Sequence, residues 1–267
     1  MTERLTAQQR RQAILEMAWT DGRAGVGQLA QRFGVTESTI RRDLALLTSQ
    51  GQLARTYGGA MAHGTALEAS LGQRAREGFR QKQAIAGWAA AQIGPGETVL
   101  LDAGTTTGQL AHELRDRDQL TVVTTGLTVL EELADADGVD VLCLGGRLRH
   151  ISQGLVGPLS EAALERVTAD RAFVGADAVT VEHGICEANL EQTRLKEMMM
   201  TRADRVYVLA DASKLGQRPF HAWARTPPSW TLVTDDGADP DQVRRFRAAG
   251  VEVILAESRP AAHAPQK

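Results

Sequence analysis

Apolar positions near the start of the chain recur at the spacing of amphipathic helices. The pattern predicts a helix over residues 7–18, a short one over residues 26–34 and a third within residues 35–51. The second stretch stops at Gly34, a residue suited to the left-handed conformation at a helix end. Thr36 precedes the third helix and is placed to cap it. The apolar stripes of the second and third helices are Leu29, Ala30 and Phe33, and Ile40, Leu44 and Leu47.

The next stretch changes to an alternating pattern. Residues 52–60 alternate Leu53 and Arg55 with polar or small residues and end in Gly58-Gly59, which predicts a small β-hairpin, or wing. Residues 61–72 show no clear period, and we interpret them as a linker. The first 60 residues are therefore expected to form a small domain of helices and a wing.

The remainder of the chain alternates strand-like and helix-like segments. A helix is expected over residues 73–92, and seven short β-branched or apolar runs follow it, most of them separated by helical patterns. This alternation predicts a larger α/β domain with a mostly parallel sheet over residues 73–256, and a frayed tail over residues 257–267. The expected strands are residues 99–102, 121–124, 139–144, 171–175, 205–210, 230–234 and 251–255.

Charge is distributed unevenly between the two parts. The first 60 residues carry eight arginines against five acids, a net charge of +3, which leaves −6 for the rest of a chain whose total is −3. A basic module joined to an acidic body is typical of a nucleic-acid-binding domain attached to a second function. Two cysteines, Cys143 and Cys186, have no zinc-site or disulfide spacing, and we expect Cys143, between two leucines, to lie in the core.

Other compositional features narrow the setting of the protein. No apolar run approaches the length of a membrane span, and the polar residues 1–12 do not resemble a secretory signal, so we expect a cytoplasmic protein. The sequence gives no reason to expect a metal ion or a cofactor, because its histidines and cysteines lack ligand spacing.

The third predicted helix has the chemistry of a DNA-recognition helix. Ser38, Thr39, Arg41 and Arg42 lie opposite its apolar stripe, and the helix follows a glycine turn as in a helix-turn-helix. Arginine can bind guanine edges or phosphates, and short hydroxyl side chains allow close approach to the bases. The alternative is a solvated arginine-rich face. The predicted DNA contacts are Thr36, Ser38, Thr39, Arg41 and Arg42, with Arg55 and Tyr57 added if the hairpin touches DNA instead of being purely structural.

The segment "DAGTTT", residues 102–107, follows the first predicted strand of the larger domain. Ligands of open α/β sheets bind at the carboxyl ends of strands. The amides of residues 104–106 and the threonine hydroxyls suit an anion, most simply a phosphate, whereas Asp102 would accept hydrogen bonds from sugar hydroxyls. A purely structural turn is the alternative interpretation.

Ordered motifs support a family resemblance. The run "VGQLAQRFGVTESTIRRDLALLTSQGQLARTYGGA" resembles the winged helix-turn-helix of the DeoR family of bacterial transcription regulators. "DAGTTT", "GGRLRHISQGLVGP", "ADRAFVGADAV" and "VLADASKLG" resemble motifs of that family's sensor domain. The resemblance implies a sensor that shares the fold of ribose-5-phosphate isomerases and binds a phosphorylated sugar or a related metabolite.

The resemblance also implies ligand-binding positions. Asp102, Gly104, Thr105 and Thr106 would form the anion cradle, and Gly145 would allow close backbone approach with Arg147 at the rim. Asp177, Asn189 and Lys196 would face the sugar, and Lys214 would supply a positive charge. Thr125 stands where the family often has asparagine, which would alter which hydroxyls are read.

Two functions remain open at the level of sequence. The first is a DNA-binding repressor of a carbohydrate-metabolism operon, acting as a dimer or tetramer on double-stranded operator DNA and controlled by a phosphorylated sugar. The second is a sugar-phosphate isomerase or lyase with an accessory DNA-binding domain, in which carboxylates such as Asp102 would act as general bases. Cys186 beside His183 suggests nucleophilic chemistry only weakly, because no base or oxyanion donor is placed for it.

Overall fold

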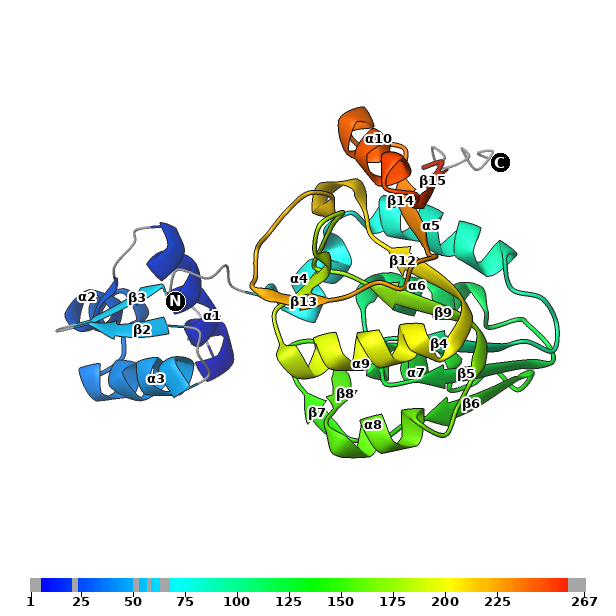
Figure 1. Cartoon of the computed structure of the whole chain (residues 1–267). Coiled ribbons are helices and arrows are strands. Elements are labelled where there is room, and N and C mark those ends of the chain that lie inside the picture. Colours follow the sequence, from blue (N-terminus) through cyan, green and yellow to red (C-terminus); the bar gives the residue numbers. More distant parts are fainter. Residues whose placement is uncertain (1–5, 21–23, 50–52, 57–58, 63–67, 259–267) are drawn as a thin grey trace, which may run out of the picture. The chain divides into compact units, whose positions relative to one another are not determined.

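The chain divides into two compact units. The computed structural model describes residues 6–20, 24–49, 53–56, 59–62 and 68–258. The first unit spans residues 1–67 and the second residues 68–267 (Figure 1). Most of the expected tail, and the middle of the expected linker, lie outside the described residues. None of the described helices is both long and apolar enough to cross a membrane.

The described residues of the first unit form three helices and a small antiparallel sheet. Its helices are α1 (Ala7–Thr20), α2 (Val26–Phe33) and α3 (Glu37–Ser49). Its strands are arranged in the order β1 (Ala24–Gly25), β3 (Gly59–Ala62), β2 (Leu53–Thr56). Gly34 ends α2 in the left-handed conformation, with φ of 61°, as the sequence predicts. The predicted stripes are confirmed, because Leu29, Ala30, Ile40, Leu44 and Leu47 are buried together with Ile14 and Leu15, and Phe33 packs against them partly buried.

The second unit is built on a seven-stranded sheet in which all neighbours are parallel. The strand order is β15-β14-β12-β9-β4-β5-β6, so each of the seven strands expected from the sequence is confirmed. The strands are β4 (Thr98–Leu101), β5 (Leu120–Thr124), β6 (Val139–Cys143), β9 (Ala169–Gly175), β12 (Ala203–Leu209), β14 (Thr231–Asp235) and β15 (Glu252–Ala256). The chain moves outward from β4 to β6 and then returns to the other side of β4. That reversal creates a switch point between β4 and β9, the place where open α/β sheets bind ligands.

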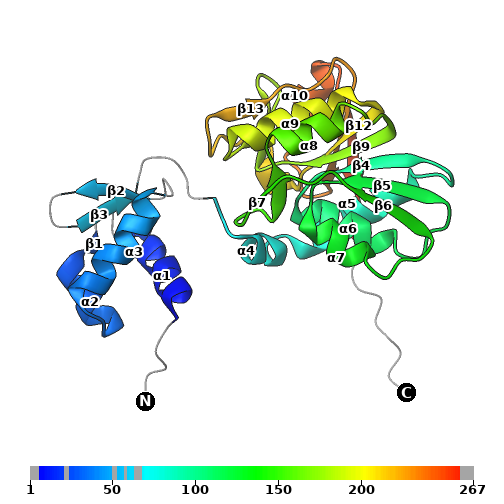
Figure 2. The ribbon, with the colours of Figure 1, turned by 90° about the horizontal axis from the view of Figure 1, so that it is seen from below.

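Helices cover both faces of this sheet (Figure 2). One apolar core lies under α5 (Phe79–Ala91), α6 (Thr105–Glu113) and α7 (Leu127–Leu133). The other lies under α8 (Pro158–Leu164), α9 (Leu190–Thr201) and α10 (Pro240–Ala248). Two smaller elements were not expected from the sequence: the hairpin β7 (Arg147–Arg149) and β8 (Gly154–Val156), and the sheet β10 (Ala178–Thr180), β11 (Gly184–Glu187) and β13 (Ala222–Ala224).

Two local expectations differ from the structure. The single helix expected over residues 73–92 is two helices, α4 (Leu71–Arg76) and α5, because Gly78 takes a left-handed φ of 60° between them. Cys143 is exposed and not part of the core, because β6 is an edge strand of the sheet. The first difference matters for the site, since the interruption brings residues of α4 to the edge of a cavity.

Candidate functional site

The start of α3 is organised by hydroxyl groups. The backbone N–H of Thr39 donates to Oγ1 of Thr36 at 3.3 Å, and the same oxygen lies 2.8 Å from Oγ of Ser38. Thr36 therefore caps the helix, as expected. Thr36 and Ser38 are exposed and Thr39 is half-buried, so this end of the helix presents hydroxyl groups at the surface.

The predicted arginines of α3 are also exposed. Arg41 pairs with Glu37 one turn earlier at 2.8 Å, and Arg42 is exposed beside it. Arg55 lies on β2, where its backbone pairs with Ala60, and Tyr57 lies outside the described residues. The structure therefore leaves the polar face of α3 open for a partner while its apolar face packs in the core.

Asp43, between these arginines and the apolar stripe, has a structural role that the sequence analysis missed. Its carboxylate accepts from Nε of Arg10 at 2.7 Å and from Nη1 of Arg11 at 3.4 Å, and the Asp43 side chain is only 6% exposed. One feature of the sequence could have indicated this role. Asp43 lies three residues after Ile40, which places it toward the core side of the helix. These ion pairs link α1 to α3 and hold the two helices together.

In the second unit, the switch point between β4 and β9 holds a buried ion cluster. Nζ of Lys196, on α9, donates to Oδ2 of Asp102 and lies 3.1 Å from Oε1 of Glu187. It also donates to the carbonyl of Gly175 at 2.8 Å, and the N–H of Gly175 donates to Oδ1 of Asp102 at 3.1 Å. All three ionisable side chains are 5% exposed or less. The sequence-predicted Asp102 and Lys196 are therefore brought together, but their polar atoms are already bonded to each other.

Burial controls the ionisation of this cluster. Burial raises the pKa of Glu187 to about 8, against the opposing attraction of Lys196. Burial alone would lower the pKa of Lys196, but the Asp102 and Glu187 carboxyls raise it above its ordinary value. At neutral pH the cluster consequently contains one ammonium, the Asp102 carboxyl and a proton-bearing Glu187.

The cavity beside Asp102 is too small for a sugar phosphate. This Asp102 cavity has a volume of about 10 Å³ and is lined by Thr125, Gly154, Gln192 and Lys196 among others. A volume of that size corresponds to about one water molecule. Asp102 itself is 3% exposed, which differs from the expectation of a carboxylate open to sugar hydroxyls. The physical reason is Lys196, which reaches across from α9 and neutralises the carboxylate in the sheet.

The other residues of the "DAGTTT" turn are partly enclosed. Gly104 caps α6, and its carbonyl accepts from the hydroxyls of Thr107 and Thr128. Thr105 is half-buried and Thr106 is 3% exposed. The turn thus starts α6 at the end of β4, with Thr106 and Thr107 packed inward.

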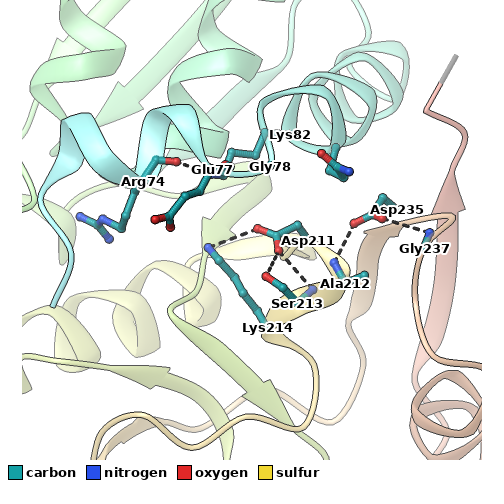
Figure 3. Close-up of a pocket in the computed structure, with 11 residues that line it drawn as sticks. Arg74, Glu77, Gly78, Lys82, Asp211, Ala212, Ser213, Lys214, Asp235 and Gly237 are labelled. Carbon is teal, nitrogen blue, oxygen red and sulfur yellow. Dashed lines mark hydrogen bonds and ion pairs between the residues drawn. The ribbon is translucent and has the colours of Figure 1, made fainter. Parts of the chain in front are cut away.

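A larger cavity lies at the neighbouring strand ends, at the junction of α4 and α5. This Lys214 pocket has a volume of about 360 Å³. Figure 3 shows that its walls come from the α4–α5 junction, from the turn that follows β12 and from the end of β14. The charged and hydroxyl residues that line it are Arg74, Glu77, Lys82, Asp211, Ser213, Lys214 and Asp235.

Backbone groups hold the carboxylates of the Lys214 pocket. Asp211 accepts from the N–H of Ser213 at 3.2 Å, and Asp235 accepts from the N–H groups of Ala212 at 2.7 Å and Gly237 at 3.0 Å (Figure 3). Lys214 donates to the carbonyl of Ala176 at 2.6 Å and lies 3.8 Å from Asp211. Each of these groups keeps further hydrogen-bonding capacity for a ligand, because a carboxylate accepts about four hydrogen bonds and an ammonium donates three.

Lys82 is a second ammonium of the pocket and was not expected from the sequence. Its Nζ donates to the carbonyls of Arg74 and Glu77, at the end of α4. Burial, followed by repulsion from Lys214, lowers the pKa of Lys82 to about 8. An anion placed between the two ammonium groups would relieve that repulsion.

The remaining predicted ligand residues are dispersed. Gly145 takes a left-handed φ of 70°, and Arg147 pairs with Glu191 on the surface. Asn189 caps α9 by accepting from the N–H of Gln192 at 3.1 Å, and Asp177 accepts from Arg74 at 3.2 Å. Only Lys214 among the predicted ligand residues lines the larger pocket.

The pocket residues that were not predicted have few distinguishing features in the sequence. Asp211 and Ser213 stand in the same "DASK" motif as Lys214, directly after a predicted strand. Arg74 and Lys82 lie in a segment with ordinary helical periodicity, so nothing local pointed to a cavity. Cys186, the candidate nucleophile, is buried, and burial raises the pKa of its thiol to about 11, so it is a poor nucleophile at neutral pH. Within the described ranges, no three His, Cys, Asp or Glu side chains gather as a metal site.

Comparisons with known proteins match both units. The family model of the DeoR C-terminal sensor domain matches residues 78–236, and that of the DeoR-like helix-turn-helix domain matches residues 10–65. The chain is 34% identical over 250 residues to a putative aga operon transcriptional repressor of Escherichia coli O157:H7, covering 92% of this chain and 93% of the relative.

Two further similarities extend the comparison. The chain is 34% identical over 251 residues to the HTH-type transcriptional regulator GlpR of Haloferax volcanii, covering 94% of this chain and 98% of the relative. Among solved structures, ribose 5-phosphate isomerase A of Methanocaldococcus jannaschii gives a TM-score of 0.39 at 17% identity, covering 52% of this chain and 55% of that one.

Proposed function

Because the chain belongs to the DeoR family of transcription regulators, we propose that it represses a carbohydrate-metabolism operon and that a phosphorylated sugar controls its affinity for operator DNA. The family and the relatives identify a DNA-binding regulator and give the isomerase or lyase alternative no support. Binding to chromosomal DNA would place the protein in the cytoplasm.

The DNA-binding half of the proposal is supported by the exposed face of α3. Ser38, Arg41 and Arg42 are exposed on a helix whose opposite side is buried. A helix of this kind enters the major groove, where arginine binds guanine edges or phosphates and serine approaches the bases closely. Two such helices in a dimer or tetramer would bind two half-sites, as operators with two-fold symmetry require.

The sensing half of the proposal is carried by one observation, the 360 Å³ pocket that holds Lys82 and Lys214. Pockets for small ligands have volumes of roughly 300–1,000 Å³. The two ammonium groups suit a phosphate, and Asp211 and Asp235 suit the hydroxyls of a sugar, because carboxylates accept from hydroxyl donors. A molecule that carries both an anion and several hydroxyls therefore fits this lining better than either a plain anion or a neutral sugar.

The proposal assigns the effector to the Lys214 pocket and not to the Asp102 cavity. The two lie on the same strand end, since Lys196 binds the carbonyl of Gly175 and Lys214 binds that of Ala176. Only the pocket has room for a sugar phosphate. In this assignment the Asp102–Lys196 pair supports the strand end beneath the ligand.

A thermal-shift experiment tests the sensing half. The full chain is heated with each of a panel of pentose and hexose phosphates, with the parent sugars, and with inorganic phosphate. A ligand that binds only the native state raises the melting temperature. We expect at least one sugar phosphate to do so, and Lys214→Gln to abolish the rise. Arg218→Gln is the matched control, because Arg218 is an exposed cation of the same segment of chain that does not line the pocket.

Two outcomes would contradict this assignment: no rise with any sugar phosphate, or an equal rise in Lys214→Gln. The DNA-binding half is tested separately by selecting duplexes from a random-sequence library with the wild-type protein. Titration of the selected duplex with and without the stabilising sugar phosphate then measures the control of operator affinity. A coupling of about 1–3 kcal/mol would change the affinity roughly 5- to 150-fold.

A further inference from the structure

Arg74 connects the Lys214 pocket to the segment at which the chain enters the second unit. It lies on α4, lines the pocket, and donates through Nη1 to Oδ1 of Asp177 at 3.2 Å. On its other side, Nη2 lies 3.8 Å from Oε1 of Glu68, within ion-pair range but beyond a hydrogen bond. Arg74 is therefore part of the pocket wall, and its guanidinium lies beside the start of the unit.

Two donor nitrogens of the Arg74 guanidinium make no hydrogen bond to the described residues. Nε and Nη2 are buried and, among the residues that the structure describes, have no hydrogen-bond acceptor. Leaving donors of a charged group unsatisfied is costly, and Nε with Nη2 forms the side of the guanidinium that binds two oxygens of a phosphate or carboxylate at once. Within the described part of the chain these buried nitrogens lack an acceptor, and an anion in the pocket would supply one once the guanidinium turns toward it.

Glu68 is held firmly by a different element. Its carboxylate forms two parallel hydrogen bonds with Arg149 of β7, one of them 2.7 Å long, and its side chain is 7% exposed. Glu68 is the first residue of the second unit, and the DNA-binding unit precedes it in the chain. A shift in the position of Glu68 therefore acts where the chain passes from the DNA-binding unit into the second unit.

We propose that Arg74 binds the anionic group of the effector and that its competition with Glu68 transmits occupancy of the pocket to the connection with the DNA-binding unit. This inference rests on the proposed function of the pocket. An anion that takes Nε and Nη2 draws the guanidinium toward the pocket and away from Glu68, which is then held by Arg149 alone. α4, which carries Arg74, begins only three residues after Glu68. A movement of Arg74 is therefore transmitted to the chain at Glu68 over a short distance along the sequence.

Three variants separate ligand binding from transmission. Arg74→Gln removes the anion contact, Glu68→Gln removes the competing carboxylate without touching the pocket, and Arg76→Gln is the matched control, an exposed arginine of the same helix that does not line the pocket. Each full-length protein is titrated with the sugar phosphate that gives the largest thermal shift and with inorganic phosphate. Its affinity for the selected duplex is then measured with and without the same probe.

The expected results differ for each variant. Arg74→Gln lowers the affinity for the probe at least tenfold and abolishes the change in DNA affinity. Glu68→Gln binds the probe at least as tightly as wild type, because the competitor for Arg74 is gone, yet its DNA affinity changes much less on probe addition. Arg76→Gln behaves as wild type in both measurements. Arg74→Lys, which keeps the charge but not the two-pronged donor, gives an intermediate probe affinity and guards against an unfolded glutamine variant.

Several results would overturn the inference. Probe affinity within twofold of wild type in Arg74→Gln would exclude the contact, and a full DNA response in Glu68→Gln would exclude the transmission. If the probe changes the DNA affinity of wild type and changes that of Arg74→Gln and Glu68→Gln as well, the inference fails and the proposed function stands. If wild type itself binds no sugar phosphate, the proposed function fails and the inference falls with it.

Discussion

Glu187→Gln offers a direct test of the buried ion cluster. Glu187 shares Lys196 with Asp102, and burial raises its pKa from 4.5 to about 8. The folded protein therefore keeps Glu187 protonated at neutral pH, and glutamine is close in shape to that neutral acid. We expect the variant to fold and to lose the pH dependence that the wild-type glutamate contributes.

The magnitude follows from the two pKa values. Between pH 4.5 and about 8 the unfolded chain has lost the Glu187 proton and the folded chain has kept it. Because the unfolded state then binds fewer protons, the free energy of unfolding falls as the pH rises. Each pKa unit corresponds to about 1.4 kcal/mol, so wild type should lose roughly 2–3 kcal/mol between about pH 5.5 and 7.5 through this group alone. Glutamine has no proton to lose and escapes this loss.

Urea denaturation at several pH values measures the difference. The free energy of unfolding is obtained for wild type and Glu187→Gln from tryptophan fluorescence, since Trp88, Trp223 and Trp230 lie in the second unit. Between about pH 5.5 and 7.5 the difference in unfolding free energy between the two proteins should shift by roughly 2–3 kcal/mol in favour of the variant. Other shifted groups cancel in the comparison because both proteins contain them.

The reasoning would be refuted if the free energies of unfolding of wild type and Glu187→Gln differed by the same amount throughout this pH range. It would also be refuted by a variant that is less stable than wild type at about pH 7.5, because Glu187 would then be a charged partner of Lys196. Glu182→Gln is the control, since Glu182 is an exposed glutamate paired with Arg245 and should leave the pH profile unchanged between about pH 5.5 and 7.5.

Three further predictions concern other parts of the chain. Arg42→Ala should weaken binding of the selected duplex about tenfold, because a base contact contributes roughly 1–3 kcal/mol; unchanged affinity in a filter-binding or fluorescence-anisotropy assay would contradict the role given to α3. Asp43→Asn should destabilise the first unit by about 3 kcal/mol, measured by circular dichroism, because it leaves the buried Arg10 charge unpaired; a melting curve identical to wild type would show that the pair contributes nothing. Gly146→Ala should destabilise the second unit by about 2 kcal/mol or more, because its methyl group would lie 2.2 Å from Oγ of Ser160 and 2.9 Å from a backbone oxygen; Gly145→Ala, with nothing within 4 Å, should cost less in the same urea titration.

The sequence by itself determined the larger elements of this protein, but not the hairpin β7–β8 or the sheet β10-β11-β13. Helical and alternating periodicities are local properties, so the recognition helix with its Thr36 cap, and all seven parallel strands, could be predicted from neighbouring residues. The break at Gly78 and the exposure of Cys143 could not, because the first depends on what α4 packs against and the second on which strand lies at the edge.

The tertiary structure decided which charges meet. Lys196 neutralises Asp102 from 94 positions away, and Arg74 binds Asp177 across 103 positions. These contacts depend on the order of the strands, which no local pattern encodes, and on burial, which makes an unpaired charge so costly that it must find a partner. Sequence therefore indicated the strand edge as a ligand site, and only the fold showed that Asp102 is sealed there while Lys82 and Lys214 line an open pocket beside it.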